Sequence, residues 1–183
     1  MMRKYLSPDE INNLLIYAKK DKLGVRNYCM LLMCYIHGFR VSELLNIKIS
    51  DIEIQSRRIF VSRLKNGFST IHPLQKKEVS AIESWLTLRK KWLRKETDWL
   101  FISENDNQRL TRQSFYHIVK KIGKNAKMII DVHPHMLRHA CGYALAEDGK
   151  DTRLIQDYLG HRNIKHTVLY TASNPERFSS ITL

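Results

Sequence analysis

Residues 133–170 read HPHMLRHACGYALAEDGKDTRLIQDYLGHRNIKHTVLY. Pro134 favours a helix that begins near His135, because proline is tolerated in a first helical turn, and Gly149 is suited to end that helix. Two further helices are expected in this stretch, from Asp151 to Gly160 and from about Asn163 to Ala172. The stretch therefore predicts three consecutive helices separated by glycine-containing turns.

Polar side chains within the same stretch have the chemistry to hold a phosphate and attack it. His135 and Arg138 are three residues apart, so both lie on one face of the expected helix near its N-terminus. Two donors at that position, supported by the helix dipole, form a site for an anion. His161 follows the next glycine, and the hydroxyl of Tyr170 comes nine residues later.

The first forty residues predict two helices. Ser7, Pro8 and Glu10 form a capping-box pattern that starts the first of them. Residues 25–37 are apolar on nearly all sides, which predicts a helix buried in the core. Gly38 is expected to end that second helix.

The next segment, GFRVSELLNI at 38–47, contains Arg40 and Glu43. An arginine at a break between a buried helix and a short new one can direct its guanidinium at a specific partner. The alternative is an Arg40–Glu43 pair on a helix surface, which would contribute only a few tenths of a kcal/mol. Taken alone, the segment favours the surface pair.

Alternating apolar residues between 50 and 73 predict three short antiparallel strands. Asn66 and Gly67 are a strong hairpin signal. The hairpin would carry Lys65 at its tip, where a long side chain can reach a neighbouring groove. A solvated turn lysine is the more common meaning of such a residue.

Beyond the hairpin, we expect a helix over 77–94, an extended apolar piece at 99–102 and a helix from Thr111 to Gly123. The sequence therefore predicts a single domain over residues 1–183, mainly α with a small three-stranded antiparallel sheet (α+β). Between residues 107 and 130 there are six basic residues and no acidic one, which makes them the best candidates for contact with a phosphate backbone: Arg109, Arg112, Lys120, Lys121, Lys124 and Lys127.

Composition points to a polyanionic partner. The chain has 183 residues and a formal net charge of +13, which solubility alone does not explain, although a merely basic cytosolic protein is the alternative. Three cysteines without CxxC pairing are typical of buried thiols in a reducing compartment. No apolar run reaches membrane-spanning length, so we expect a cytoplasmic protein without membrane contact.

The sequence does not match the motifs of a zinc site or of a serine hydrolase. His135 and His139 have the i, i+4 spacing of a zinc motif, but the glutamate of HExxH is missing and Arg138 would repel the ion. A GxSxG nucleophile motif is absent from the sequence. Four other histidines are interpreted as structural or surface residues: His72, His117, His133 and His166.

Taken together, the segments GFRVSE, HPHMLRH and LGHRNIKHTVLYT resemble the motifs of the tyrosine recombinase/integrase family in order and approximate spacing. Three longer segments are similar to the fimbrial phase-variation recombinases within that family: RNYCMLLMCYIHGFRVSE, RLKNGFSTIHPL and DTRLIQDYLGHRNIKHTVLYTAS. The resemblance covers nearly the whole chain and implies the catalytic-domain fold of tyrosine recombinases.

The resemblance also implies roles for individual residues. Tyr170 would be the nucleophile, Arg40 and Arg138 the phosphate clamp, and Lys65 the general acid on the leaving 5′-oxygen. Two arginines can meet the developing charge bidentately. Neither a metal nor ATP would be needed, because the covalent phosphotyrosyl bond stores the bond energy.

Three supporting residues follow from the same resemblance. His135 would act as acid or base for the tyrosine proton, and His161 would donate to the phosphate. Glu43 would orient Arg40 or a neighbouring side chain without contacting the phosphate itself.

The implied activity is site-specific cleavage and rejoining of duplex DNA at inverted repeats, by a tetramer assembled on two sites in the nucleoid, with accessory DNA-bending proteins as possible partners. Such a reaction inverts a promoter segment and switches fimbrial expression. Fewer than forty residues precede Arg40, so we expect no separate N-terminal core-binding domain. Two alternatives are a DNA-binding transcriptional regulator that keeps the fold without activity and a relaxing topoisomerase of the same chemistry.

Overall fold

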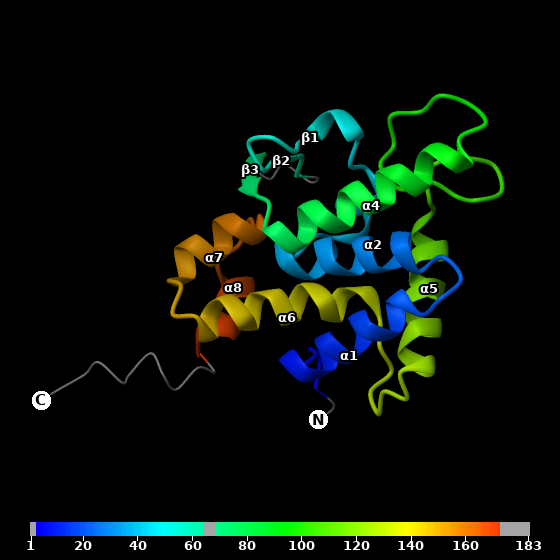
Figure 1. The fold of residues 1–183 in the computed structure, drawn as a ribbon. Helices are drawn as coiled ribbons and strands as arrows, with labels where there is room; N and C mark the ends of the chain where they lie inside the picture. The colour runs from blue at the N-terminus through cyan, green and yellow to red at the C-terminus, as the bar shows by residue number, and fades with distance from the viewer. Residues whose placement is uncertain (1–2, 64–68, 173–183) are drawn as a thin grey trace, which may run out of the picture.

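The computed structural model describes residues 3–63 and 69–172, which form a mainly helical domain with one small sheet (Figure 1). The helices are α1 (Pro8–Lys19), α2 (Gly24–His37), α3 (Val41–Leu45), α4 (Lys76–Trp92), α5 (Arg112–Asn125), α6 (Pro134–Glu147), α7 (Thr152–Leu159) and α8 (Lys165–Ala172). The strands are β1 (Ile52–Glu53), β2 (Arg58–Val61) and β3 (Thr70–Pro73), preceded by the 3-10 turn η1 (Ile49–Asp51). The predicted fold class is confirmed.

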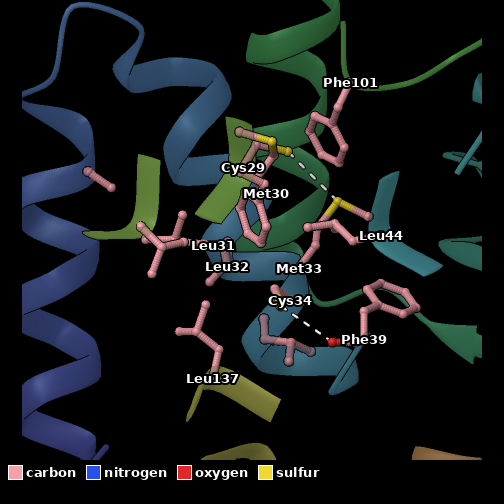
Figure 2. Packing of buried hydrophobic residues seen from close by; sticks show 14 of the residues in the cluster. Cys29, Met30, Leu31, Leu32, Met33, Cys34, Phe39, Leu44, Phe101 and Leu137 are labelled. Atoms are coloured by element: carbon pink, nitrogen blue, oxygen red, sulfur yellow. Dashed lines mark hydrogen bonds between the residues drawn. The ribbon is translucent and has the colours of Figure 1, made fainter. Parts of the chain in front are cut away.

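Helix α2 lies at the centre of the domain, where α1, α4 and α6 pack against it (Figure 1). The six consecutive residues 29–34 are each at most 1% exposed, as expected for a helix that is apolar on nearly all sides. Figure 2 shows these side chains beside Leu44, Phe101 and Leu137, which come from three different segments. The core therefore joins the N-terminal half of the chain to α6.

Most predicted helix ends are found. Ser7 and Glu10 form the capping box of α1, and Gly38 ends α2 in the left-handed conformation with a φ of 59°. The predicted end at Gly123 is wrong, because α5 continues past it. A Cβ on Gly123 would lie 2.9 Å from the Cβ of Val132, so this glycine permits close packing and does not end the helix.

The sheet has the order β1-β2-β3 with antiparallel neighbours. In β2, Ile59 and Val61 face the core, and Ile59 pairs with His72 of β3. His72 is itself buried, which agrees with its interpretation as a structural residue. Lys65, at the expected tip of the β2–β3 hairpin, lies outside the described residues.

A second apolar cluster holds the C-terminal helices against α6. Its buried members are Cys141, Ala146, Ile155, Leu159 and Tyr170. Helices α7 and α8 both contact α6 and each other, and Figure 1 shows them beside one end of it. This cluster positions the aromatic ring of Tyr170 inside the protein.

Helices long and apolar enough to span a membrane do not occur in residues 3–63 and 69–172. All three cysteines are buried free thiols, as the sequence predicts.

Candidate active site

An open cleft of about 1050 Å³ lies where the start of α3 meets α6, α7 and α8. Its wall includes five of the six predicted catalytic residues: Arg40, His135, Arg138, His161 and Tyr170. They come from three separate segments, which the central packing of α2 and α6 holds together. The fold thus brings the predicted group into one cavity, apart from Lys65, which lies outside the described residues.

Glu43 lies behind the cleft and is 3% exposed. Its carboxylate accepts from the backbone N–H of Arg40 at 2.9 Å and from Nη1 of Arg40 at 2.7 Å. Nη1 of Arg138 lies 3.8 Å from the same carboxylate. The surface pair favoured by the local sequence is therefore wrong, because burial of Glu43 makes the contact part of the interior.

Backbone carbonyl groups fix the side chains of Arg40 and Arg138 further. Arg138 donates to the carbonyl of Gly38 and, at 2.9 Å, to that of Leu159. Arg40 donates to the carbonyl of Gly160 at 3.3 Å. Burial lowers the pKa of Arg138 to about 10, so its guanidinium stays charged at neutral pH. The two guanidiniums are held in place before any substrate binds.

Arg63 is a site-forming residue that the sequence interpretation missed. It donates to Glu43 Oε2 at 3.0 Å and to the carbonyl of Tyr158. A Cβ on Gly160 would lie 2.9 Å from Cδ of Arg63, so the glycine makes room for this side chain. The sequence contained one indication of this role. Side chains alternate between the two faces of a strand, so residue 63 lies on the same buried face as Ile59 and Val61 although it is charged.

The side chain of Tyr170 is enclosed on several sides and the residue is 2% exposed. Its ring lies so close to α6 that a Cβ on Gly142 would be 2.6 Å from ring atom Cε2. The ring of Tyr143 meets it edge-on, with centroids 5.1 Å apart. Burial raises the pKa of Tyr170 to about 12, although Arg138 and Arg40 act in the opposite direction.

Histidines surround the Tyr170 hydroxyl and the neighbouring cleft. His139 Nδ1 lies 2.9 Å from the hydroxyl oxygen of Tyr170. The ring of His161 stacks on that of Tyr170 at 6.1 Å, while its Nδ1 is hydrogen-bonded to Thr167 Oγ1 at 2.8 Å. His135 contacts His139 edge-on, with ring centroids 4.5 Å apart. The sequence interpretation considered His139 only as a metal ligand, although its spacing from His135 placed it on the same helix face.

Burial also sets the charge of these histidines. It lowers the pKa of His161 to about 3 and that of His139 to about 4. Arg138 lowers the pKa of His161 further, and repulsion between the protonated forms of His135 and His139 lowers that of His139 further. The pKa of His135 is lowered for the same reasons. At neutral pH these rings are uncharged, so each can accept a proton or donate a neutral hydrogen bond.

Comparison with models of protein families finds one that matches nearly the whole chain. The model of the phage integrase family matches residues 4–177. This chain belongs to the phage integrase family. Its match includes every cleft residue described above, from Arg40 to Tyr170.

Relatives in this family are similar over nearly the whole chain. The type 1 fimbriae regulatory protein FimB of Escherichia coli K12 is 53% identical over 98% of this chain and 89% of its own length. The regulatory protein FimE of the same strain is 49% identical over 98% of this chain and 90% of its own. The crystal structure of XerA recombinase superposes with a TM-score of 0.85 at 33% identity, covering 98% of this chain and 64% of XerA. The predicted membership of the tyrosine recombinase/integrase family, with the fimbrial recombinases as similar members, is confirmed.

The predicted phosphate-contact residues do not form one uniform surface in this family member. Arg112 lines a hollow of about 840 Å³ that shares Arg40 and His135 with the cleft. Lys120 pairs with Asp131, Lys121 pairs with Asp21, and Arg109 donates to Asn46. The two lysines without a described ion pair are exposed: Lys124 and Lys127.

Groups of three or more His, Cys, Asp or Glu side chains arranged to hold a metal ion do not occur in the described part of the chain.

Proposed function

We propose that this protein is a tyrosine-type site-specific recombinase that cuts and rejoins duplex DNA, and that it inverts a promoter segment for fimbrial phase variation. The observation that carries the proposal is the cleft in which the Tyr170 side chain faces the clamp arginines Arg40 and Arg138. The similarity to FimB and FimE supports the fimbrial role.

The proposed reaction begins with attack of the Tyr170 oxygen on a DNA phosphorus. A bond from that oxygen to phosphorus forms, the bond from phosphorus to the 5′-oxygen breaks, and a 3′-phosphotyrosine results. Arg40 and Arg138 neutralise the charge on the nonbridging oxygens. Lys65 gives a proton to the leaving 5′-oxygen, and attack by a 5′-hydroxyl of the partner strand then reverses these steps.

The other cleft residues support the transferred phosphate in this proposal. His161 donates to a nonbridging oxygen, and His135, next to Arg138 on α6, acts as acid or base for the tyrosine proton. Glu43 keeps the guanidinium of Arg40 oriented. Resident metal or nucleotide cofactors are not required, because the attacked bond is replaced by one of similar energy.

The proposed substrate is double-stranded DNA carrying inverted repeats, bound by four copies of the chain on two sites. Recombination requires cleavage at both sites, and a tetramer supplies one tyrosine for each strand. DNA-bending proteins of the nucleoid would bring the sites together. Arg112, beside the cleft, is the best-placed residue for contact with the flanking backbone.

The test is covalent trapping on a nicked suicide substrate. Wild-type protein is expected to form an adduct that resists denaturation, and Tyr170→Phe is expected to bind the DNA without forming it. Arg40→Ala and Arg138→Ala should each slow trapping by about a hundredfold or more, because one stabilising donor group is lost. General affinity should change little, because many basic residues supply it.

The same experiment separates the alternatives. DNA binding without any adduct from the wild-type protein would indicate a regulator that keeps the fold but not the activity. An adduct that survives Tyr170→Phe would contradict the assignment of the nucleophile. Relaxation of a supercoiled plasmid that lacks the repeats would indicate a topoisomerase.

A further inference from the structure

His139 occupies a position that the roles assigned above do not use. It follows Arg138 directly on α6, and its Nδ1 lies 2.9 Å from the Tyr170 hydroxyl oxygen. The two rings are edge to face, with centroids 5.8 Å apart. The nucleophile of the proposed reaction is therefore already hydrogen-bonded to an imidazole next to the phosphate clamp.

The other two histidines of the cleft are placed differently. His161 uses Nδ1 for a hydrogen bond with Thr167 and presents its ring face to Tyr170. His135 contacts the ring of His139 and lies on the side of the cleft toward Arg112. Among the described residues, the histidine that contacts the tyrosine hydroxyl is His139.

We infer that His139 is the general base that takes the proton of Tyr170 when the tyrosine attacks DNA, and the general acid that returns it when DNA is rejoined. This inference rests on the proposed function. In this inference His139, and not His135, accepts the tyrosine proton, and His135 contacts the transferred phosphate.

Each proton that is released or taken up in cleavage and rejoining has a donor and an acceptor among the groups of the proposed reaction. The Tyr170 proton passes to Nδ1 of His139 while the bond from the tyrosine oxygen to phosphorus forms. The leaving 5′-oxygen receives its proton as in the proposed reaction. On rejoining, the imidazolium of His139 protonates the departing tyrosine oxygen. Acceptance at Nδ1 requires the tautomer with hydrogen on Nε2.

The electrostatics of the cleft favour this transfer. A neutral imidazole is needed before attack, and burial with neighbouring cations lowers the pKa of His139 to about 4. The groups facing it are His133, His135 and Arg138 on α6 and its start, Lys4 before α1, His161 before α8, and Tyr170 itself. The raised pKa of Tyr170 disfavours a free phenolate, so a base in contact is useful. A bound phosphate would offset the cost of an imidazolium.

The test is the pH dependence of single-turnover cleavage at saturating DNA, between pH 6.5 and 9.5, with the suicide substrate. Wild-type cleavage is expected to be nearly independent of pH, because His139 is neutral throughout. His139→Ala and His139→Gln should be slower by about a hundredfold or more at pH 7. Their rates should rise about tenfold per pH unit, because Tyr170 must then ionise to solvent before it attacks.

Two further measurements exclude a merely structural effect. Added imidazole is expected to accelerate His139→Ala, whose missing ring leaves space, more than His139→Gln, whose side chain fills that space. His117→Ala, on the exposed face of α5, is the matched control and should keep the wild-type rate and profile. Mobility-shift binding and thermal unfolding verify that each variant is folded and saturated.

Several outcomes would overturn the inference. Flat profiles in both His139 variants would show that His139 only positions the ring, and faster cleavage would show that it restrains Tyr170. If the cleavage rate rises steeply with pH in His135→Ala but is independent of pH in His139→Ala, the general base for Tyr170 is His135 and not His139. Mapping the adduct by mass spectrometry keeps the two proposals apart, since an adduct at another residue contradicts the proposed function itself.

Discussion

The carboxylate of Glu43 contacts three guanidinium groups inside the protein, those of Arg40, Arg63 and Arg138. The side chains of Glu43, Arg63 and Arg138 are at most 2% exposed. A buried charge that loses its counter-charge costs far more than the pair contributes over an apolar replacement. Glu43 therefore compensates a buried cationic cluster, and in the proposed function it also orients the arginines that bind the phosphate.

Replacement of Glu43 by glutamine should affect both properties. Glu43→Gln keeps the shape but leaves the cationic cluster uncompensated, so we expect a loss of about 3 kcal/mol in the free energy of unfolding. Urea denaturation measures this loss, and suicide-substrate trapping should be slowed in the same variant. Glu83→Gln, on the exposed face of α4, is the control and should change neither quantity. Unchanged stability in Glu43→Gln would contradict the role of this carboxylate.

A buried polar network joins four elements of the fold. His37 at the end of α2 has Nε2 at 2.8 Å from Glu78 Oε1 of α4 and Nδ1 at 3.1 Å from Nδ1 of His72 on β3. His72 Nε2 is hydrogen-bonded to Thr70 Oγ1 at 3.0 Å. The ring of Tyr158, on α7, stacks on His72 with centroids 4.2 Å apart. The network connects β3 to α7, the helix that ends just before Gly160 and His161.

This network predicts a loss of stability in mild acid. Burial lowers the pKa of His72 to about 3 from the ordinary value of 6.5, so the unfolded chain binds the proton first as the pH falls. The contribution is present above pH 6.5 and declines below it, by about 1 kcal/mol between pH 7 and pH 5.5. Urea denaturation across this range measures the decline.

His72→Asn tests that assignment because asparagine can form hydrogen bonds without titrating. The variant should be less stable at pH 7 but should lose less stability on acidification than the wild type. His117→Asn replaces an exposed histidine and should keep the wild-type pH dependence. Equal slopes for His72→Asn and the wild type would show that His72 does not titrate in this range.

Over the whole molecule, the formal net charge is +13, and individual basic side chains are engaged to different degrees. Arg112 lies beside the cleft, whereas Lys121 on the same helix is engaged with Asp21 at 2.9 Å. Long-range attraction depends on all the charges, but each phosphate contact depends on a free cation at the right place. The two residues should therefore differ in their contribution to DNA binding.

The salt dependence of DNA binding tests this difference. Arg112→Ala should reduce the slope of log K against log salt by about 0.9, the value for one lost phosphate contact. Lys121→Ala should leave the slope unchanged, because its ammonium is already paired. Fluorescence anisotropy with a duplex containing the recombination site measures both slopes. A larger effect from Lys121→Ala would place the DNA along the other face of α5.

Local patterns in the sequence account for the elements and most of the cleft residues. Ser7 with Glu10, the apolar run of α2 and the glycines at 38 and 160 predict helix positions, because caps and periodicity act over a few residues. The spacing of His135 and Arg138 placed both on one helix face for the same reason. By itself, the sequence therefore determined the fold class and most helix positions, and its resemblance to the recombinase motifs identified five residues that line the cleft.

Contacts between distant segments were decided only by the tertiary structure. Arg63 reaches Glu43 on α3, while His139 and Gly142, both on α6, contact Tyr170 on α8. Periodicity indicates which face of a helix is buried, but not which side chain of another segment will meet it there. That choice depends on how α2, α6 and α8 pack, because close packing leaves room for few arrangements of the side chains between them.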